Sequence, residues 1–191
     1  LWYIKNGKIS YETAVIDYDD TSWIITNGKV NTSANNFYKF NNTWYFVKEG
    51  EIQTDYTDVV KVGNEWWYVK NGVVPASGTT VAQNENGWWY IKNGKVDFNY
   101  TGIAKNRNGW WRIVGGKVDF NCNSVEKNEL GWWYIRGGKV DFSYNDVAQN
   151  RNGWWVINGG KVNFGFNGTY KVGVRDYYVS GGKVNGCNYY M

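Results

Sequence analysis

The stretch Gly87-Trp-Trp-Tyr-Ile-Lys-Asn-Gly-Lys-Val-Asp-Phe98 decides how this chain folds, because its pattern returns along the whole sequence. The turn glycine within it belongs to a series spaced 21 residues once and 22 thereafter: Gly7, Gly28, Gly50, Gly72, Gly94, Gly116, Gly138, Gly160 and Gly182. Such a period is typical of repeat arrays, in which each unit buries its apolar face only against its neighbours. The sequence therefore predicts one elongated repeat domain, residues 1–191, of nine repeats that are degenerate at both ends.

Each repeat is predicted to be a β-hairpin. In residues 88–98 an aromatic and β-branched run meets a second short run across Asn93-Gly94, the favoured type I′ turn pair. A two-residue loop at this point pairs Ile91 with Val96. The expected fold class is all-β, a single-layer β-solenoid of about nine consecutive β-hairpins with no helix beyond a turn. The interval 99–109 is expected to be a linker to the next hairpin.

Alternation along the strands predicts which residues share a face. One face is expected to be the core, with Trp89, Ile91, Val96 and Phe98. The Ile91 position stays apolar in every repeat: Ile4, Ile25, Val47, Val69, Ile91, Ile113, Ile135, Ile157 and Val179. The opposite face mixes rings with a carboxylate and an amide, through Trp88, Tyr90, Asp97 and Asn99. That mixture is typical of a binding surface.

The composition combines a polar average with many flat rings. Aromatic residues make up 19% of the chain, including 13 Trp and 16 Tyr, while the mean hydropathy is -0.59. No apolar run reaches the roughly 20 residues that span a bilayer, so no membrane insertion is expected. The net charge of +4 is spread over the repeats, whereas a nucleic-acid-binding protein gathers its basic residues in one patch. We therefore expect no nucleic-acid partner.

Enzymatic activity and metal binding are disfavoured by the residue inventory. The chain has no His, the commonest general base, and its two Cys lie three repeats apart, so we expect free thiols, no metal and no cofactor. Paired carboxylates catalyse glycoside hydrolysis, but Asp97, Asp119 and Asp141 are copies of one position. The chain also opens within a repeat and carries no signal peptide. We expect it to be the C-terminal part of a larger protein, where a catalytic domain can precede it.

The Trp/Tyr cluster, the Gly turn and the following aromatic resemble the aromatic cell-wall-binding repeats of Gram-positive bacteria. Similar repeats include choline-binding repeats, glucan-binding repeats and the C-terminal repeats of clostridial toxins. The resemblance covers the whole chain, but the repeat sequence here differs from the choline-binding pattern, which has an Asp-Gly turn and a Met. It implies an extracellular, cell-surface-associated solenoid with ligands held in shallow grooves between neighbouring hairpins.

The resemblance also implies which rings line those grooves, namely the first Trp of each pair, the Tyr two residues on, and the aromatic after the second strand. In this sequence they are Trp88, Tyr90, Tyr100, Trp110, Trp132, Tyr134, Tyr144 and Trp154. From their place beside the rings we add Asp97, Asp119 and Asp141, which can accept sugar hydroxyls or attract a cation. Arg112, Val156 and Cys122 interrupt the pattern, so a complete cage is not expected at every joint.

Three functions are compatible with this pattern. The favoured one is a non-catalytic module that anchors a larger secreted protein to a cell-wall polysaccharide or teichoic acid, with choline or another glycan as the recognised group. A purely structural role is equally open for any single ring, because rings also pack between hairpins. The alternative is a spacer, or an adhesin that binds a host protein or host glycan.

Overall fold

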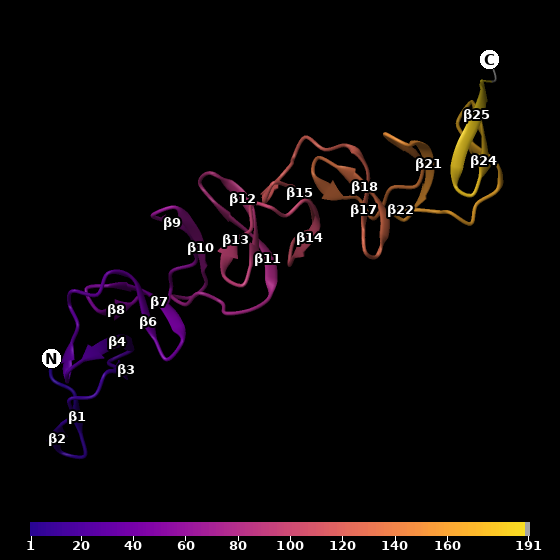
Figure 1. Ribbon diagram of the computed structural model, residues 1–191. Helices are drawn as coiled ribbons and strands as arrows, with labels where there is room; N and C mark the ends of the chain where they lie inside the picture. Colours follow the sequence, from indigo (N-terminus) through magenta and orange to yellow (C-terminus); the bar gives the residue numbers. More distant parts are fainter. Residues whose placement is uncertain (190–191) are drawn as a thin grey trace. The chain divides into compact units, whose positions relative to one another are not determined.

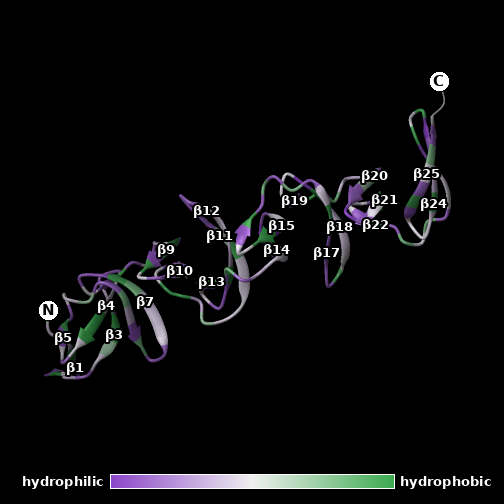
Figure 2. Ribbon diagram, turned by 45° about the horizontal axis from the view of Figure 1, so that its top comes forward, coloured by the Kyte–Doolittle hydropathy of each residue, from purple (hydrophilic) through white to green (hydrophobic). Residues whose placement is uncertain are grey.

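The computed structural model describes residues 1–189, with no side chain described for Tyr189, and consists of β-strands and turns (Figure 1). The described residues contain no helix, and hence none long and apolar enough to cross a membrane. Short hydrophobic stretches lie on the strands between hydrophilic turns (Figure 2). The all-β prediction is confirmed.

The chain divides into two compact units, which we describe separately. The first holds residues 1–86 and 91–96, and the second holds residues 87–90 and those from 97 onward. Strand β12 (Gly87–Lys92) contributes residues to both. The other strands of the first unit are β1 (Ile4–Lys5), β2 (Lys8–Ile9), β3 (Ala14–Tyr18), β4 (Thr21–Thr26), β5 (Lys29–Val30), β6 (Asn36–Phe40), β7 (Thr43–Lys48), β8 (Glu51–Ile52), β9 (Asp58–Val62), β10 (Glu65–Val69), β11 (Thr79–Asn84) and β13 (Lys95–Val96).

The second unit continues with the same succession of long and short strands. They are β14 (Gly102–Asn106), β15 (Gly109–Val114), β16 (Lys117–Val118), β17 (Ser124–Asn128), β18 (Gly131–Arg136), β19 (Lys139–Val140), β20 (Val147–Asn150), β21 (Gly153–Asn158), β22 (Lys161–Val162), β23 (Gly168–Val172), β24 (Arg175–Ser180) and β25 (Lys183–Tyr189).

The repeat formed by β14, β15 and β16 contains three strands rather than the expected two. All of β14 pairs with residues 109–113 of β15, and β15 also pairs with β16, where Ile113 lies opposite Val118. The equivalent Ile91 and Val96 pair likewise, so the predicted register is confirmed. The linker prediction for 99–109 is wrong in part, because β14 occupies residues 102–106 of it. Its apolar pair Ile103-Ala104 belongs to that strand, and Ile103 is buried.

The predicted turns are present at every glycine of the series. All nine glycines have φ between 73° and 85°, and the residue before each also has a positive φ. Two consecutive positive φ values define a type I′ turn, which Asn-Gly and Gly-Gly adopt at little cost. Glu49 accepts this conformation as well, with φ 50°, ahead of Gly50. Turn chemistry therefore sets the period of the array.

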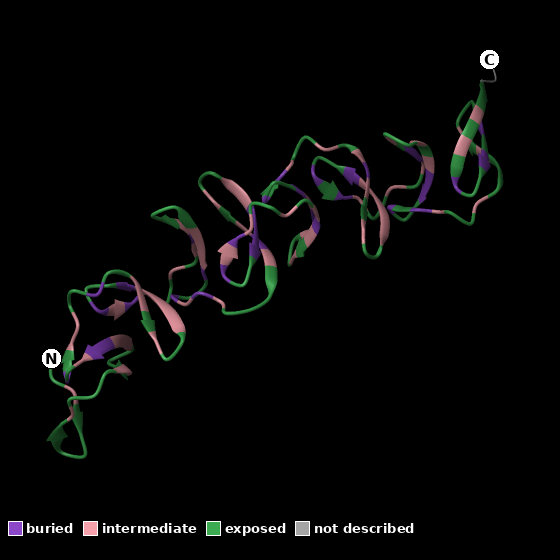
Figure 3. Ribbon diagram, viewed as in Figure 1, coloured by how far each residue is buried: buried purple, intermediate pink, exposed green. Residues whose placement is uncertain are grey.

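The core of each unit follows the predicted apolar column. Ile113, Ile135 and Ile157 are at most 1% exposed, and only Ile4, at the start of the chain, is exposed among the described members of the column. Burial is concentrated on short segments of the strands (Figure 3) and on the turn glycines from Gly28 to Gly182, while the residue before each of these glycines is exposed. Each fully buried Ile contributes about 1.5–3 kcal/mol to folding.

The prediction for Phe98 is wrong: this ring is 45% exposed instead of lying in the core. Its equivalents Phe120, Phe142 and Phe164 are 46%, 46% and 47% exposed. The reason is the length of the second strand, which ends at Val96, so that Phe98 lies in the following turn and not in the pleated register of a strand.

Backbone hydrogen bonds join consecutive repeats through the turn glycine. Gly138 donates its N–H to the carbonyl of Cys122 at 3.0 Å, and its own carbonyl accepts the N–H of Arg112 at 2.7 Å. Gly160 makes the equivalent pair of bonds, to Tyr144 and from Tyr134. Since both partners belong to the preceding repeat, each turn closes the joint to its neighbour.

Candidate functional site

The second Trp of each pair is fixed by an Asn at the start of the hairpin turn. Asn128 accepts the indole N–H of Trp133 at 3.0 Å and the backbone N–H of Leu130 at 2.9 Å through the same side-chain oxygen. Asn106 holds Trp111, and Asn150 holds Trp155, in the same manner. This Asn therefore builds the turn and orients the ring.

The first unit departs from this arrangement at its N-terminal end. Tyr18 stands at the position of these Asn residues, and the indole N–H of Trp23 is buried without a hydrogen-bond partner. A buried unpaired donor is costly, so the orientation of Trp23 depends on packing alone.

In the second unit, three rings from two consecutive repeats meet at three of the joints. The first Trp of one repeat contacts the second Trp and the Phe of the next repeat. Ring centroids lie 4.8–6.4 Å apart in three clusters: Trp88–Trp111–Phe120, Trp110–Trp133–Phe142 and Trp132–Trp155–Phe164. These are direct ring contacts, and the Phe of each cluster is half-exposed.

A lysine accompanies each second Trp. The ammonium of Lys161 lies 5.0 Å from the ring centroid of Trp133, and Lys139 lies 5.3 Å from that of Trp111. The stem of Lys161 runs beside Gly131, where an added Cβ would lie 2.6 Å from Lys161 Cε. The glycine before each Trp pair of the second unit thus leaves room for the lysine, and a cation lies near each ring cluster.

The predicted Tyr positions form a separate feature. Tyr90 is only 7% exposed and stacks on Tyr100 with centroids 3.8 Å apart, while Tyr134 stacks on Tyr144 at 4.0 Å. The hydroxyls of Tyr100 and Tyr144 donate to the carbonyls of Ile103 and Val147, each at 3.0 Å. These rings pack against one another within their own repeat, so Tyr90 has little surface left for a ligand.

Burial raises the pKa of Tyr144 to about 12, from its ordinary value of 10, with the Asp146 carboxylate adding to the shift. Because the neutral phenol is favoured in the folded state, its contribution to stability is complete below pH 10 and disappears as the pH rises from 10 to 12. We expect the melting temperature to fall over this window, and to fall less in Tyr144→Phe. Thermal melts from pH 9 to 12 measure this, with Tyr11→Phe, an exposed ring, as the matched variant. Identical slopes for Tyr144→Phe and the native chain would contradict it.

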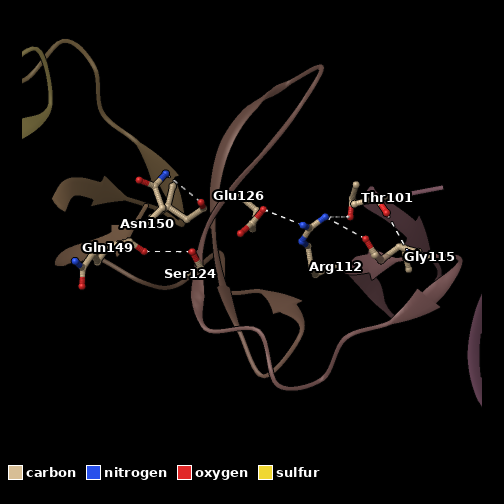
Figure 4. A network of polar contacts seen from close by, with 10 residues as sticks. Thr101, Arg112, Gly115, Ser124, Glu126, Gln149 and Asn150 are labelled. Carbon is tan, nitrogen blue, oxygen red and sulfur yellow. Dashed lines mark hydrogen bonds and ion pairs between the residues drawn. The ribbon is translucent and has the colours of Figure 1, made fainter. Parts of the chain in front are cut away.

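Where the sequence interrupts the Tyr pair, a polar network replaces the stack (Figure 4). Arg112 donates to the carbonyls of Gly102 and Ile113 at 3.3 and 3.0 Å and forms an ion pair with Glu126 at 3.3 Å. Cys122, at the position of Tyr100, packs against the apolar cluster of Ile103, Ile135 and Val140. Burial raises the pKa of its thiol. Both Cys are free, as predicted.

The predicted carboxylates organise the turn after the second strand. Asp97 and Asp119 each accept the backbone N–H two residues on, at 3.0 Å. Asp141 accepts both the N–H and the hydroxyl of Ser143, and the hydroxyl bond lowers the Asp141 pKa. Asn163 makes the equivalent bond to Gly165 at 3.2 Å, so the turn does not need the charge. Among the described residues no three His, Cys, Asp or Glu side chains gather where they could hold a metal ion.

The structure thus brings Trp88, Trp110 and Trp132 into the ring clusters, with Trp154 45% exposed in the next repeat. It places Tyr90, Tyr100, Tyr134 and Tyr144 in stacks, and the Asp residues in turns. The sequence interpretation assigned two groups of cluster members to the core: the second Trp residues and the Phe residues. The signal for the Phe position was the Asp-Phe-Asn sequence after Val96. A second strand that ends at Val96 leaves the following Phe outside the strand, and therefore outside the core face.

The array of hairpins joined by ring clusters defines a class of aromatic repeat proteins. A choline-binding repeat model matches more than half of the chain, at residues 2–10, 33–51, 55–74, 77–97, 99–119, 123–141 and 143–163. The chain therefore belongs to the choline-binding repeat family, which confirms the predicted resemblance. Among curated protein sequences there is no match.

Solved structures with a similar course of the chain include choline binding protein F from Streptococcus pneumoniae. It is 19% identical, with a TM-score of 0.40, over 96% of this chain and 60% of that one. The modular autolysin LytC from Streptococcus pneumoniae, in complex with a synthetic peptidoglycan ligand, is 12% identical, with a TM-score of 0.36, over 95% and 44%. The chain thus spans less than two thirds of the length of either protein.

Proposed function

We propose that this chain is a non-catalytic module that holds a larger secreted protein at a bacterial surface polymer, a wall polysaccharide or a teichoic acid. The observation that carries the proposal is the recurrence, every 22 residues, of a ring cluster with a half-exposed Phe: Phe120, Phe142 and Phe164. Membership of the choline-binding repeat family supports it. A row of equivalent surfaces suits a ligand that is itself repetitive.

The chemistry of the clusters suits sugars that carry anionic groups. Flat rings stack on the apolar faces of sugars, and the lysine beside each cluster can attract a phosphate. Trp88, Trp110, Trp132 and Trp154 belong to these surfaces in our proposal. Asp97, Asp119 and Asp141 lie beside them and act through the turns that they hold.

Binding strength is expected to come from repetition. One half-exposed ring with a few polar neighbours binds a sugar weakly, but several along one polymer raise the apparent affinity by about 10²–10⁴-fold through effective concentration. We therefore expect the chain to bind a long polymer far more tightly than the isolated monomer unit.

The test is sedimentation of the chain with purified Gram-positive walls, with and without their teichoic acid. We expect retention on intact walls, release by wall sugars or polymer fragments, and weaker retention after teichoic acid is removed. Release by choline alone would identify an ammonium-binding version of the same function. Absence of retention on every wall would contradict the proposal.

The second candidate, a spacer or an adhesin for a host protein, is favoured by one observation. The rings of each cluster already contact one another at 4.8–6.4 Å, as rings with a purely structural role do. A spacer would show no change in tryptophan fluorescence with wall polymer, whereas the proposed module would.

A further inference from the structure

From residue 31 onward, one linker between repeats lacks a turn that the other linkers share. In the linker that joins β13 to β14, Tyr100 donates its N–H to the carbonyl of Asp97 at 3.3 Å, which closes a turn. The equivalent bond, at 2.9–3.3 Å, is made by Ala34, Tyr56, Cys122, Tyr144 and Phe166. The corresponding residues of the remaining linker, 75–78, are all described and form no such bond. Pro75-Ala-Ser-Gly78 is therefore an open segment.

The attachment of this linker to the next hairpin turn is also reduced. In the other six linkers the fourth residue accepts the N–H of the turn glycine, and the fifth caps the residue before that glycine, as the Thr101 hydroxyl does for Gly115 at 3.1 Å. Here the carbonyl of Gly78 accepts the N–H of Asn93 at 2.8 Å, so one bond replaces two. Gly78 also has no side chain at the position where Tyr100 stacks on Tyr90.

The same segment is open to solvent. Residues 76–79 are all exposed, and a Cβ placed on Gly78 would meet no atom within 4 Å. Of the six alanines in the chain, all within the described residues, Ala76 alone is exposed. An exposed segment with few hydrogen bonds opens at a low free energy, and segments of this kind are the preferred sites of proteolysis.

We propose that the peptide bond between Ala76 and Ser77 is a processing site for a serine endoprotease with a small, elastase-like S1 pocket, which suits the Ala76 side chain. Water adds across this bond, which leaves a carboxylate on Ala76 and a free amino group on Ser77. The inference goes beyond the proposed function. All three ring clusters, from Trp88 to Phe164, follow the cut, so cleavage divides the chain before Ser77 from the part that carries them.

The first experiment digests the full folded chain with a small amount of pancreatic elastase and identifies the first products by intact mass spectrometry. We expect one early pair of fragments, of which the first ends at Ala76 and the second begins at Ser77. Hydrogen exchange of the undigested chain gives an independent readout. The amides of Ser77 and Gly78 should exchange faster than those of Asn99 and Tyr100, which are hydrogen-bonded to Asp97.

The test variant is Pro75→Asp/Ala76→Phe/Ser77→Asn/Gly78→Tyr, which gives residues 75–79 the sequence of 97–101. It is digested with proteinase K, which cuts after aromatic and aliphatic residues, so that loss of Ala76 does not itself prevent cleavage. We expect cleavage in this linker to be about tenfold slower than in the native chain, because proteolysis follows the population of the opened segment. Pro75→Ala, which restores neither the carboxylate nor the ring, is the matched control and should be cut like the native chain.

The proposal is overturned if elastase first cuts outside residues 75–79, or if Ser77 and Gly78 exchange no faster than Asn99 and Tyr100. It is also overturned if the linker replacement retains its melting temperature and is cut as fast as the native chain. A replacement that unfolds would be cut at many sites, and the exchange comparison within the native chain then decides.

Discussion

Replacing Gly138 by Asn is expected to destabilise the second unit by about 3–5 kcal/mol. A Cβ at this position would lie 2.5 Å from the carbonyl oxygen of Asp119 and 2.8 Å from the Cα of Phe120, both backbone atoms of the preceding repeat. Overpacking of this kind costs about 1–3 kcal/mol. Moving the turn away would also break the two hydrogen bonds through which Gly138 joins that repeat, at about 1 kcal/mol each.

Gly137→Asn is the matched control, because it places the same side chain on the adjacent residue of the same turn. Gly137 has φ 55°, close to the 50° of Asn93 in an equivalent turn, and its nearest neighbour for a Cβ is 3.9 Å away. We expect it to change stability by no more than about 0.5 kcal/mol. Urea unfolding followed by tryptophan fluorescence measures both variants. Equal urea midpoints for Gly138→Asn and Gly137→Asn would contradict the prediction, because the close backbone contact at Gly138 would then have no effect on stability.

The turns and the apolar column could be predicted because both depend on local chemistry. Asn93-Gly94 requires positive φ at two consecutive residues, and this requirement fixes the pairing of Ile91 with Val96. The same reasoning applies at every repeat, so one well-formed copy predicts the others. Even Glu49-Gly50, which lacks the usual Asn or Gly, follows the pattern.

The third strand of each repeat was missed because its sequence does not alternate. Gly102-Ile-Ala-Lys-Asn106 has one buried apolar residue and ends in an Asn that acts as a turn former. Its pairing is set by the neighbouring Trp strand, a tertiary effect that propensity does not contain. The side-chain bonds of Asn106 to Asn108 and Trp111 are the feature that could have revealed the hairpin turn.

The rings of the inter-repeat clusters could be predicted only in part. The first Trp of each pair was expected at the inter-repeat joints, where the structure places it. The core prediction is wrong for Phe142, but Trp133 does pack against a buried cluster while it also contacts Trp110. A ring can satisfy both a packing role and a surface role because only one of its faces needs to be covered. The sequence pattern alone does not distinguish these roles.

The central claim is that a row of half-exposed rings binds a repetitive polymer, and it predicts a large loss when the row is removed. Replacing Phe120, Phe142 and Phe164 together by Leu keeps apolar contact with the Trp rings but removes the flat stacking faces. Loss of several sites on one polymer should weaken apparent wall affinity by about 10²-fold, since avidity depends on the number of engaged sites. One such replacement alone should have a much smaller effect.

The most direct measurement is therefore the apparent dissociation constant for purified walls of the native chain and of this triple Phe→Leu variant. Tyr11→Leu combined with Tyr18→Leu, which removes two exposed rings outside the clusters, is the control. The account predicts strong binding by the native chain and by the control, and a loss of about 10²-fold in the triple variant at a similar melting temperature. Wall affinity that is unchanged in a folded triple variant would contradict it.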